Sequence, residues 1–367
     1  MTRITEHSIE DFTIQLLEQL GYEYIYAPNI APFPSSGGVD AESGRGGSLH
    51  SSGGVDSDEG GRRGGNDARS SYEEVLLTHR MAEAVRRINP TVPTAAQDEA
   101  IKEIQRIHSP ELLTNNESFH RLLTEGIKVS YQKHGLQRGD LVWLIDFNTP
   151  ENNDFVVANQ FTVVEDGVTK RPDVILFVNG IPLVVLELKN AADENATIKS
   201  AFRQIETYKA VIPSLFTYNA FSIISDGLEA RAGTLSSGMS RFMAWRSADG
   251  KEEASHLVNQ IETLINGMLN KETLLDLIRH FIVFEKSKKE DAKTGLTTIS
   301  TVKKMAAYHQ YYAVNRAVES TLRATGYLSN QSAVLDDTKE KAAEPPEEYG
   351  LPDVKRQPKG DRKGGVV

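Results

Sequence analysis

The 367-residue sequence contains no cysteine, which excludes disulfide bonds and zinc sites built from thiolates. It has no uninterrupted apolar stretch of the ~18 residues that a membrane-spanning helix needs, and its first residues lack the apolar core of a signal peptide. Its nine histidines show no paired spacing of metal ligands, and the G-x-S-x-G motif of serine hydrolases is absent. These absences favour a cytoplasmic protein without a membrane segment.

An excess of basic residues is also missing, because 51 acidic residues outnumber 41 basic ones and the formal net charge is −10. This balance argues against indiscriminate binding to nucleic acid, which favours a basic domain. It leaves room for a local basic channel, and a metal site made of carboxylates adds acidic residues of its own. The fractions of charged (25%) and hydrophobic (39%) residues are typical of a globular chain.

The stretch from Lys170 to Lys189 organises the rest of the sequence. It consists of two apolar runs on either side of an Asn-Gly pair at positions 179 and 180, which is a strong hairpin signal. Almost pure Val, Ile, Leu and Phe predicts strands that are buried on both faces. Asp173, Glu187 and Lys189 interrupt this pattern, and buried charges without partners are costly. A divalent metal held by the two carboxylates, with the lysine beside it, would explain all three.

The register of this hairpin decides whether the two carboxylates meet. A two-residue turn would place Asp173 opposite Leu186 and would direct Glu187 to the other face. A three-residue loop, Val178 to Gly180 with a G1 bulge, places Asp173 opposite Val185, with Glu187 as its diagonal neighbour ~7–8 Å away. We therefore predict the bulged hairpin. The alternative is a strand-end Asp that serves the turn and a Glu187–Lys189 pair on the surface.

The helix predicted over Thr197–Lys209 adds Gln204 and Tyr208, which are four residues apart and share one face. Pro172-Asp173, Glu187-Leu188-Lys189 and Gln204-x-x-x-Tyr208 together resemble the PD-(D/E)xK nuclease core with its Q-x-x-x-Y extension. The amino-acid sequence of the hairpin resembles that of the restriction and motor (R) subunit of type I restriction enzymes, and the similarity runs from about Thr5 to the C-terminus except for one insert.

This resemblance implies an α/β fold, a mixed β-sheet flanked by helices, followed by a helical region that leads into a truncated motor domain. It implies a site-specific deoxyribonuclease in which Asp173, Glu187 and the carbonyl of Leu188 bind Mg²⁺ and Lys189 acts in catalysis. Gln204 and Tyr208 would position DNA. Glu10 would be a further metal ligand on the first helix, although a first-turn Glu is also favoured by the helix dipole.

The resemblance also divides the chain into three parts. Residues 1–248 are expected to form the endonuclease domain, with a disordered Gly/Ser-rich insertion at 32–71. Residues 249–299 are a helical connector, and 300–367 are the start of an ATP-dependent motor. Gln310 resembles the glutamine that reads adenine in such motors. Lys363 to Val367 resembles the strand before a Walker A loop, but that loop does not occur, so we expect a truncated chain.

The apolar periodicity predicts further elements. Helices are expected at 8–20, 72–88, from Thr94 with a capping box to Gln97, and at 116–125, 252–269, 274–284 and 300–323. Strands are expected at 22–26, 127–132, 141–147, 154–164, 220–227 and 229–234, with a charged loop at 286–293.

The expected partners of the complete subunit are duplex DNA, a methyltransferase subunit and a specificity subunit, and its expected cofactors are Mg²⁺ and ATP. Two alternatives remain at this point. One is a docking arm that only joins the motor to the modification core, and the other is a stand-alone nuclease of DNA repair or of a mobile element.

Overall fold

The computed structural model describes residues 6–30, 32, 69–190, 197–255, 258–290 and 297–325. The chain divides into two compact units, residues 1–248 with 254–305 and residues 249–253 with 306–367. The predicted division at residues 248 and 299 remains a prediction. Within the described ranges, no helix has the length and apolar character needed to cross a bilayer.

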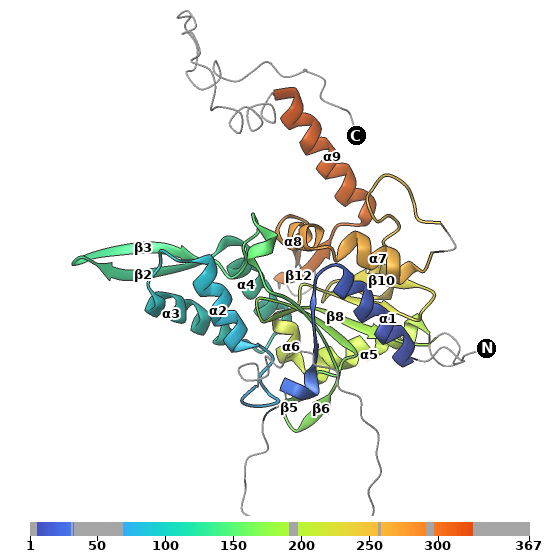
Figure 1. Cartoon of the computed structure of the whole chain (residues 1–367), viewed down its shortest axis with the longest axis horizontal. Helices are drawn as coiled ribbons and strands as arrows, with labels where there is room; N and C mark the ends of the chain where they lie inside the picture. The colour runs from blue at the N-terminus through green and yellow to red at the C-terminus, as the bar shows by residue number, and fades with distance from the viewer. Residues whose placement is uncertain are drawn as a thin grey trace, which may run out of the picture. The chain divides into compact units, whose positions relative to one another are not determined.

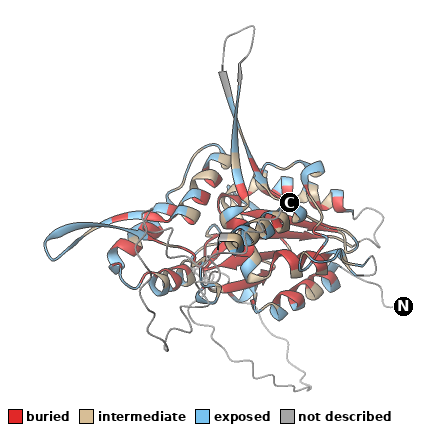
Figure 2. Cartoon of the chain, turned by 90° about the horizontal axis from the view of Figure 1, so that it is seen from above, coloured by how far each residue is buried: buried red, intermediate tan, exposed pale blue. Residues whose placement is uncertain are grey.

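A six-stranded mixed sheet forms the centre of the first unit (Figure 1). β8 lies parallel to β9 and β1 lies parallel to β4, and the other neighbours are antiparallel. Every residue of β4, β7, β8 and β9 is buried (Figure 2), which confirms that the hairpin strands are covered on both faces. The α/β fold with a mixed sheet flanked by helices is thereby confirmed. The order is β1 (Glu23–Tyr26), β4 (Phe155–Asn159), β7 (Val174–Val178), β8 (Ile181–Leu188), β9 (Phe221–Ser225) and β10 (Ala230–Gly233).

Helices and short ribbons surround this sheet. Helix α1 (Glu6–Gln19) contacts β1, β4 and β8, while α5 (Ile198–Val211) contacts β8 and β9. The other helices of the first unit are α2 (Thr78–Ile88), α3 (Thr94–Gln105), α4 (Leu112–Glu125), α6 (Pro213–Thr217), α7 (Gln260–Met268) and α8 (Lys271–His280), with short 3-10 turns η1 (Ala27–Ile30), η2 (Pro150–Asn152) and η3 (Met239–Arg241). Three two-stranded ribbons are β2 (Ile127–Lys133) with β3 (Leu136–Val142), β5 (Val163–Glu165) with β6 (Val168–Lys170), and β11 (Ile282–Glu290) with β12 (Thr297–Met305).

The predicted turn of the β7–β8 hairpin is wrong. Asn179 (φ 51°) and Gly180 (φ 75°) form a two-residue turn, as expected for type I′, and Val178 pairs with Ile181. The irregularity lies further along, where Phe177 pairs with Pro182 but Leu176 pairs with Val184, so the extra residue sits within β8. The shift leaves Val174 opposite Leu186, and the next positions outward, 173 and 187, therefore share a face.

Long-range contacts explain why the short turn is preferred. The buried Asn179 side chain accepts from the Asp154 amide (2.7 Å) and donates to the Leu144 carbonyl (2.8 Å) and to Asn153 (2.8 Å). The Leu77 amide donates to the Gly180 carbonyl (2.9 Å), and a Cβ at position 180 would lie 2.4 Å from the Leu77 carbonyl oxygen. These contacts fix both turn residues in the left-handed region.

Several predicted element bounds are also wrong. The helix expected at 72–88 begins at Thr78, because Leu77 is bound to the hairpin turn. The strand expected at 141–147 is β3, which ends at Val142 and pairs with β2 rather than with the sheet. The strand expected at 154–164 is divided by Gln160 (φ 57°). The expected capping box at Thr94 is absent, since the Gln97 side chain donates to the carbonyls of Asn89 and Val92.

The region after residue 250 contains more strand than expected. The helix predicted at 300–323 starts only at Tyr308, because 297–305 form β12. β12 pairs with β11, which includes residues 286–290 of the predicted charged loop. The helix predicted at 252–269 spans Gln260–Met268.

The predicted insertion is too long at its C-terminal end. Residues 33–68 and 363–367 lie outside the described residues, but Arg69 is described and its side chain is buried. Its amide donates to the Ile30 carbonyl (3.1 Å), and its side chain donates to the carbonyls of Glu74 (3.2 Å) and Thr162 (2.9 Å). The guanidinium also lies 3.9 Å from the centre of the Phe161 ring. The two ends of the insert are therefore joined by a hydrogen bond.

The second unit contains α9 (Tyr308–Thr325) and the segment 249–253. The Tyr308 hydroxyl donates to Glu253 (2.6 Å), and Gly250 lies against the Tyr312 ring, which leaves no space for a Cβ. Gln310 lies in the first turn of α9, where its side-chain oxygen accepts from the Ala307 amide (2.9 Å). Its predicted contact with adenine remains a prediction.

Candidate active site

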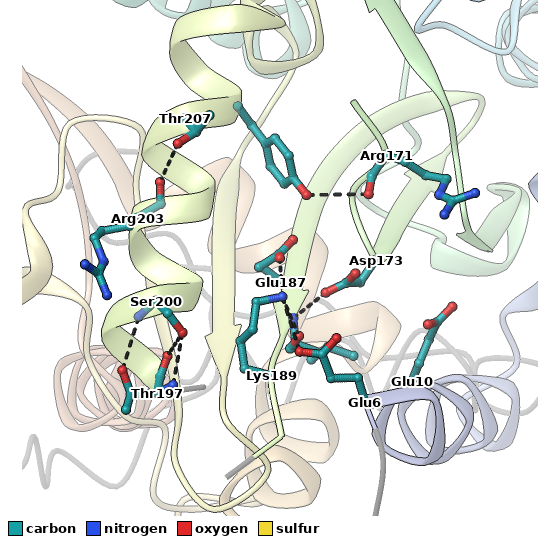
Figure 3. Close-up of polar contacts among 12 residues, drawn as sticks. Glu6, Glu10, Arg171, Asp173, Glu187, Lys189, Thr197, Ser200, Arg203 and Thr207 are labelled. Atoms are coloured by element: carbon teal, nitrogen blue, oxygen red, sulfur yellow. Dashed lines mark hydrogen bonds and ion pairs between the residues drawn. The ribbon is translucent and has the colours of Figure 1, made fainter. Parts of the chain in front are cut away.

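The ends of β7 and β8 bring the three charged residues of the hairpin together (Figure 3). Asp173 lies just before β7, and its Oδ2 accepts from the Leu188 amide at 2.7 Å. Glu187, at the end of β8, has a side chain that is only 2% exposed. Lys189 follows β8, and its Nζ donates to Glu187 Oε1 (2.7 Å) and to the Leu188 carbonyl (3.1 Å). The predicted proximity of the three side chains is thus present, although the register that produces it is different.

The two carboxylates share a poorly solvated environment. Burial raises the pKa of Glu187, and the nearby charge of Asp173 raises it further, against the opposing effect of Lys189. Burial likewise raises the pKa of Asp173, although the hydrogen bond from the Leu188 amide and the charge of Lys189 lower it. Burial lowers the pKa of Lys189, but Glu187 and Asp173 outweigh this effect and the net pKa is raised. The lysine therefore stays charged beside two carboxylates that tend to retain protons.

Helix α1 contributes two more carboxylates. Glu6 lies 3.6 Å from the Lys189 ammonium. Glu10 is buried, accepts from Asn159 Nδ2 (2.6 Å) and Gln160 Nε2 (3.2 Å), and is close enough to Asp173 to raise the pKa of that residue. Glu10 thus belongs to the same neighbourhood, although its oxygens are engaged by the end of β4.

Helix α5 places Tyr208 beside this cluster, with Gln204 hydrogen-bonded to Tyr208. Tyr208 is buried, and its hydroxyl lies 3.5 Å from the Arg171 carbonyl, two residues before Asp173. Burial raises the pKa of Tyr208, and Glu187 raises it further, while a side-chain hydrogen bond with Gln204 lowers it. The predicted helix is correct, and Thr197 caps it by accepting from the Ser200 amide at 3.3 Å.

The chemistry of the donors suits a hard cation. The Asp173 and Glu187 carboxylates and the Leu188 carbonyl offer only oxygen ligands, the set that Mg²⁺ prefers. Glu187 Oε2 is buried and accepts no hydrogen bond of normal geometry, although the Tyr208 hydroxyl is close enough to Glu187 to lower the pKa of that carboxyl group; a cation would satisfy this oxygen. Among the described residues, no three or more His, Cys, Asp or Glu side chains converge closely enough to hold a metal. A metal here would accordingly need the backbone carbonyl or water.

Some residues of the site carried no signal in the sequence. Asn159 and Gln160 hold Glu10 through contacts that span about 150 positions, which local patterns do not reveal. Glu6 was detectable in principle, since it lies one helical turn before Glu10 and shares its face. Arg171 is exposed, and its carbonyl accepts from the Tyr208 hydroxyl; the apolar pattern of the hairpin indicates no role for it.

Comparisons with known proteins agree with this arrangement. The model of the type I restriction enzyme R protein N terminus matches residues 55–241, about half of the chain. The type I restriction enzyme HindI endonuclease subunit of Haemophilus influenzae is 38% identical over 325 residues, covering 88% of this chain and 27% of that protein. A protein of Methanocaldococcus jannaschii, provisionally named as the endonuclease subunit of a type I restriction enzyme, is 26% identical over 341 residues, covering 88% of this chain and 28% of that protein.

The chain thus spans little more than a quarter of the length of these two relatives. The match to the family model includes Asp173, Glu187, Lys189, Gln204 and Tyr208. This chain belongs to the family of type I restriction enzyme R proteins and carries the N-terminal region of that family.

Proposed function

We propose that this chain is the DNA-cleaving region of a type I restriction R subunit and that it hydrolyses phosphodiester bonds of duplex DNA with Mg²⁺. The observation that carries the proposal is the meeting of Asp173, Glu187 and Lys189 in one cluster around the buried Glu187, with Lys189 Nζ 2.7 Å from Glu187. Clusters of buried ionisable groups with perturbed pKa values are typical of catalytic sites. Family membership and the endonuclease names of the relatives support the same reaction.

Asp173, Glu187 and the Leu188 carbonyl would hold the magnesium ion. When bound, the ion would supply Lewis acidity toward the phosphate and lower the pKa of a coordinated water. Glu187 Oε2, which is buried and makes no hydrogen bond of normal geometry, would be one of its ligands. Glu10 would join through a water molecule, since its carboxylate is held by Asn159 and Gln160 and Mg²⁺ usually keeps several waters.

Lys189 would act on the reacting phosphate. Its ammonium is held by Glu187, by the Leu188 carbonyl and by Glu6, so it is aimed into the pocket before substrate arrives. In this position it would stabilise negative charge that develops on the phosphate or orient the attacking water. Gln204 and Tyr208, on α5, would position the strand that is cut.

The complete subunit would couple this cleavage to ATP-driven translocation of DNA, with Gln310 at the adenine. It would act in the cytoplasm in a complex with methyltransferase and specificity subunits. The names of the relatives support membership of such a multi-subunit enzyme. ATP hydrolysis and translocation would be activities of the complete subunit.

The test uses the R subunit reconstituted with its methyltransferase and specificity subunits on plasmid DNA. Asp173→Ala and Lys189→Ala should each reduce cleavage by at least ~10²-fold while translocation continues, because removal of one preorganised charge stabiliser costs about that factor. Lys102→Ala, on the exposed side of α3, is the control for removal of a lysine. Undiminished cutting by both site variants would favour the docking arm. Cutting by the chain alone, without ATP or partners, would favour a stand-alone nuclease.

A further inference from the structure

The β2–β3 ribbon extends away from the sheet and is exposed over most of its length (Figures 1 and 2). α3 packs against β2 near its base, where Ile127 and Val129 are buried. Beyond this base, positions 132–141 are all exposed. A two-residue turn at His134 (φ 54°) and Gly135 (φ 76°) closes the tip. The outer half therefore stands free within the first unit.

The ribbon as a whole is basic, with Lys128 at its base and Lys133 and Arg138 in its free half. Lys128, Lys133 and Arg138 are exposed, and none of them takes part in an ion pair of the described residues. The acid on the ribbon, Asp140, accepts a hydrogen bond from the Tyr131 hydroxyl at 2.9 Å. Three cations against one carboxylate stand out in a chain with a net charge of −10. A locally positive surface on an acidic chain favours binding of a polyanion.

The two faces of the ribbon carry different side chains. Residues paired across the ribbon share a face, so Gln132 faces Gln137 and Ser130 faces Gly139 on one side. Tyr131 faces Arg138 and Lys133 faces Leu136 on the other. The first face also carries Lys128, which pairs with Leu141, and the second also carries Asp140, which pairs with Val129. Near the tip, the first face therefore presents the amides of Gln132 and Gln137, and the second presents Lys133 and Arg138. Amides suit base edges and cations suit phosphates.

The dimensions agree with a nucleic-acid groove. Two strands lie ~4.8 Å apart, and the major groove of duplex DNA is ~12 Å wide and admits a two-stranded ribbon. A protein partner fits less well, because protein interface cores are depleted in charge and enriched in aromatic and apolar groups. Leu136, at 67% exposure, is the large apolar side chain at the tip.

We propose that the β2–β3 ribbon is a second DNA contact, which lies in the major groove of the duplex and binds its phosphates through Lys133 and Arg138. The inference rests on the proposed function, because it takes duplex DNA as the substrate. It adds an anchoring surface that is separate from the catalytic pocket, and the ribbon residues take no part in bond cleavage.

Binding is measured on the full chain carrying Asp173→Ala, so that DNA stays intact, with a fluorescent duplex at several KCl concentrations. Lys133→Ala/Arg138→Ala should weaken binding and reduce the slope of log K against log [salt] by about 1–2, since each phosphate contact contributes about 0.9. Arg241→Ala/Arg246→Ala removes the same charge from an exposed region beyond β10 and should leave the slope unchanged. An unchanged slope in the ribbon variant would overturn the inference.

The absence of cysteine allows a second measurement that does not depend on affinity. Lys133→Cys, labelled with a benzophenone, should crosslink to the duplex, whereas the same label at Arg241→Cys should not. Crosslinks from position 133 to a partner subunit instead of DNA, in the reconstituted complex, would refute the DNA contact. Failure of the parent chain to bind any duplex would refute the proposed substrate itself, whereas binding that ignores the ribbon would refute only this inference.

Discussion

Lys303 provides a test of the packing that is independent of catalysis. Its side chain, on β12, is buried in the first unit, where Nζ donates to Asn116 Oδ1 (2.8 Å) and to the Asn219 carbonyl (2.8 Å). The ring of Phe284 lies 5.4 Å away, and no carboxylate of the described residues pairs with the ammonium. Burial lowers the pKa of Lys303 from 10.5 to about 7.

The sign of the effect follows from proton linkage. Between the folded pKa of about 7 and the unfolded value of 10.5, the unfolded chain binds more protons than the folded chain. The free energy of unfolding should therefore rise with pH in this window, by at most ~1.4 kcal/mol per pH unit and by a few kcal/mol in total. Below about pH 7 the lysine is charged in both states, and the full cost of burial is present.

Lys303→Met should remove this rise. Urea unfolding at pH 7, 8 and 9 can be followed by fluorescence of Trp143 and Trp245, which both lie in the first unit. The substitution leaves Asn116 Oδ1 without its donor, at ~1–3 kcal/mol, so the slope with pH rather than the stability at one pH is the readout.

The neighbouring Lys304→Met is the control, because the Lys304 side chain is half exposed and pairs with Glu285. It should keep the slope of the unsubstituted chain. An equal slope in Lys303→Met would refute the reasoning about burial.

Two further predictions concern the hairpin. Gly180→Ala should lower the free energy of unfolding by several kcal/mol, because the new Cβ would lie 2.4 Å from the Leu77 carbonyl oxygen. Gly135→Ala has a similar φ but no atom within 4 Å of its Cβ, so it should cost only the ~1–2 kcal/mol of a left-handed backbone. Equal losses of stability in urea unfolding of the two variants would contradict the predicted steric clash at position 180. Glu187→Gln should abolish cleavage yet raise the melting temperature of the metal-free chain at pH 8, because the raised pKa of Glu187 means that stability falls as pH rises from 4.5 to about 7. A lower melting temperature in this variant, measured in EDTA, would show that the ion pair with Lys189 dominates instead.

The sequence predicted those features of the fold and site that depend on local pattern. Apolar runs on both sides of Asn179-Gly180 correctly predicted a doubly covered hairpin, and helical spacing correctly placed Gln204 and Tyr208 on one face. The proximity of Asp173 to Glu187 was also predicted correctly, but from a wrong register. Both the expected loop bulge and the observed strand irregularity restore the same face, since the side-chain period of a strand is two.

The remaining features depend on partners that are distant in sequence. Nothing local shows that Leu77 would bind the Gly180 carbonyl and so delay α2, or that Asn179 would be held by Leu144 and by the segment Asn153-Asp154. The lysine-rich stretch at 286–304 reads as loop and helix, because the burial of Lys303 that fixes β12 comes from α4 and the segment after α6. Pairing partners, rather than propensities, decided these elements.

The most direct test of the central claim is calorimetric titration of the chain with Mg²⁺, and with Mn²⁺ as a tighter-binding substitute. The unsubstituted chain should bind a divalent ion with release of protons, because the raised pKa values of Asp173 and Glu187 leave protons for the metal to displace. Asp173→Asn and Glu187→Gln should each abolish or greatly weaken this binding, while Glu165→Gln should not, because the Glu165 carboxylate on β5 accepts from the Ser214 amide instead. Unaltered metal binding in both site variants would contradict a metal centre formed by these two carboxylates.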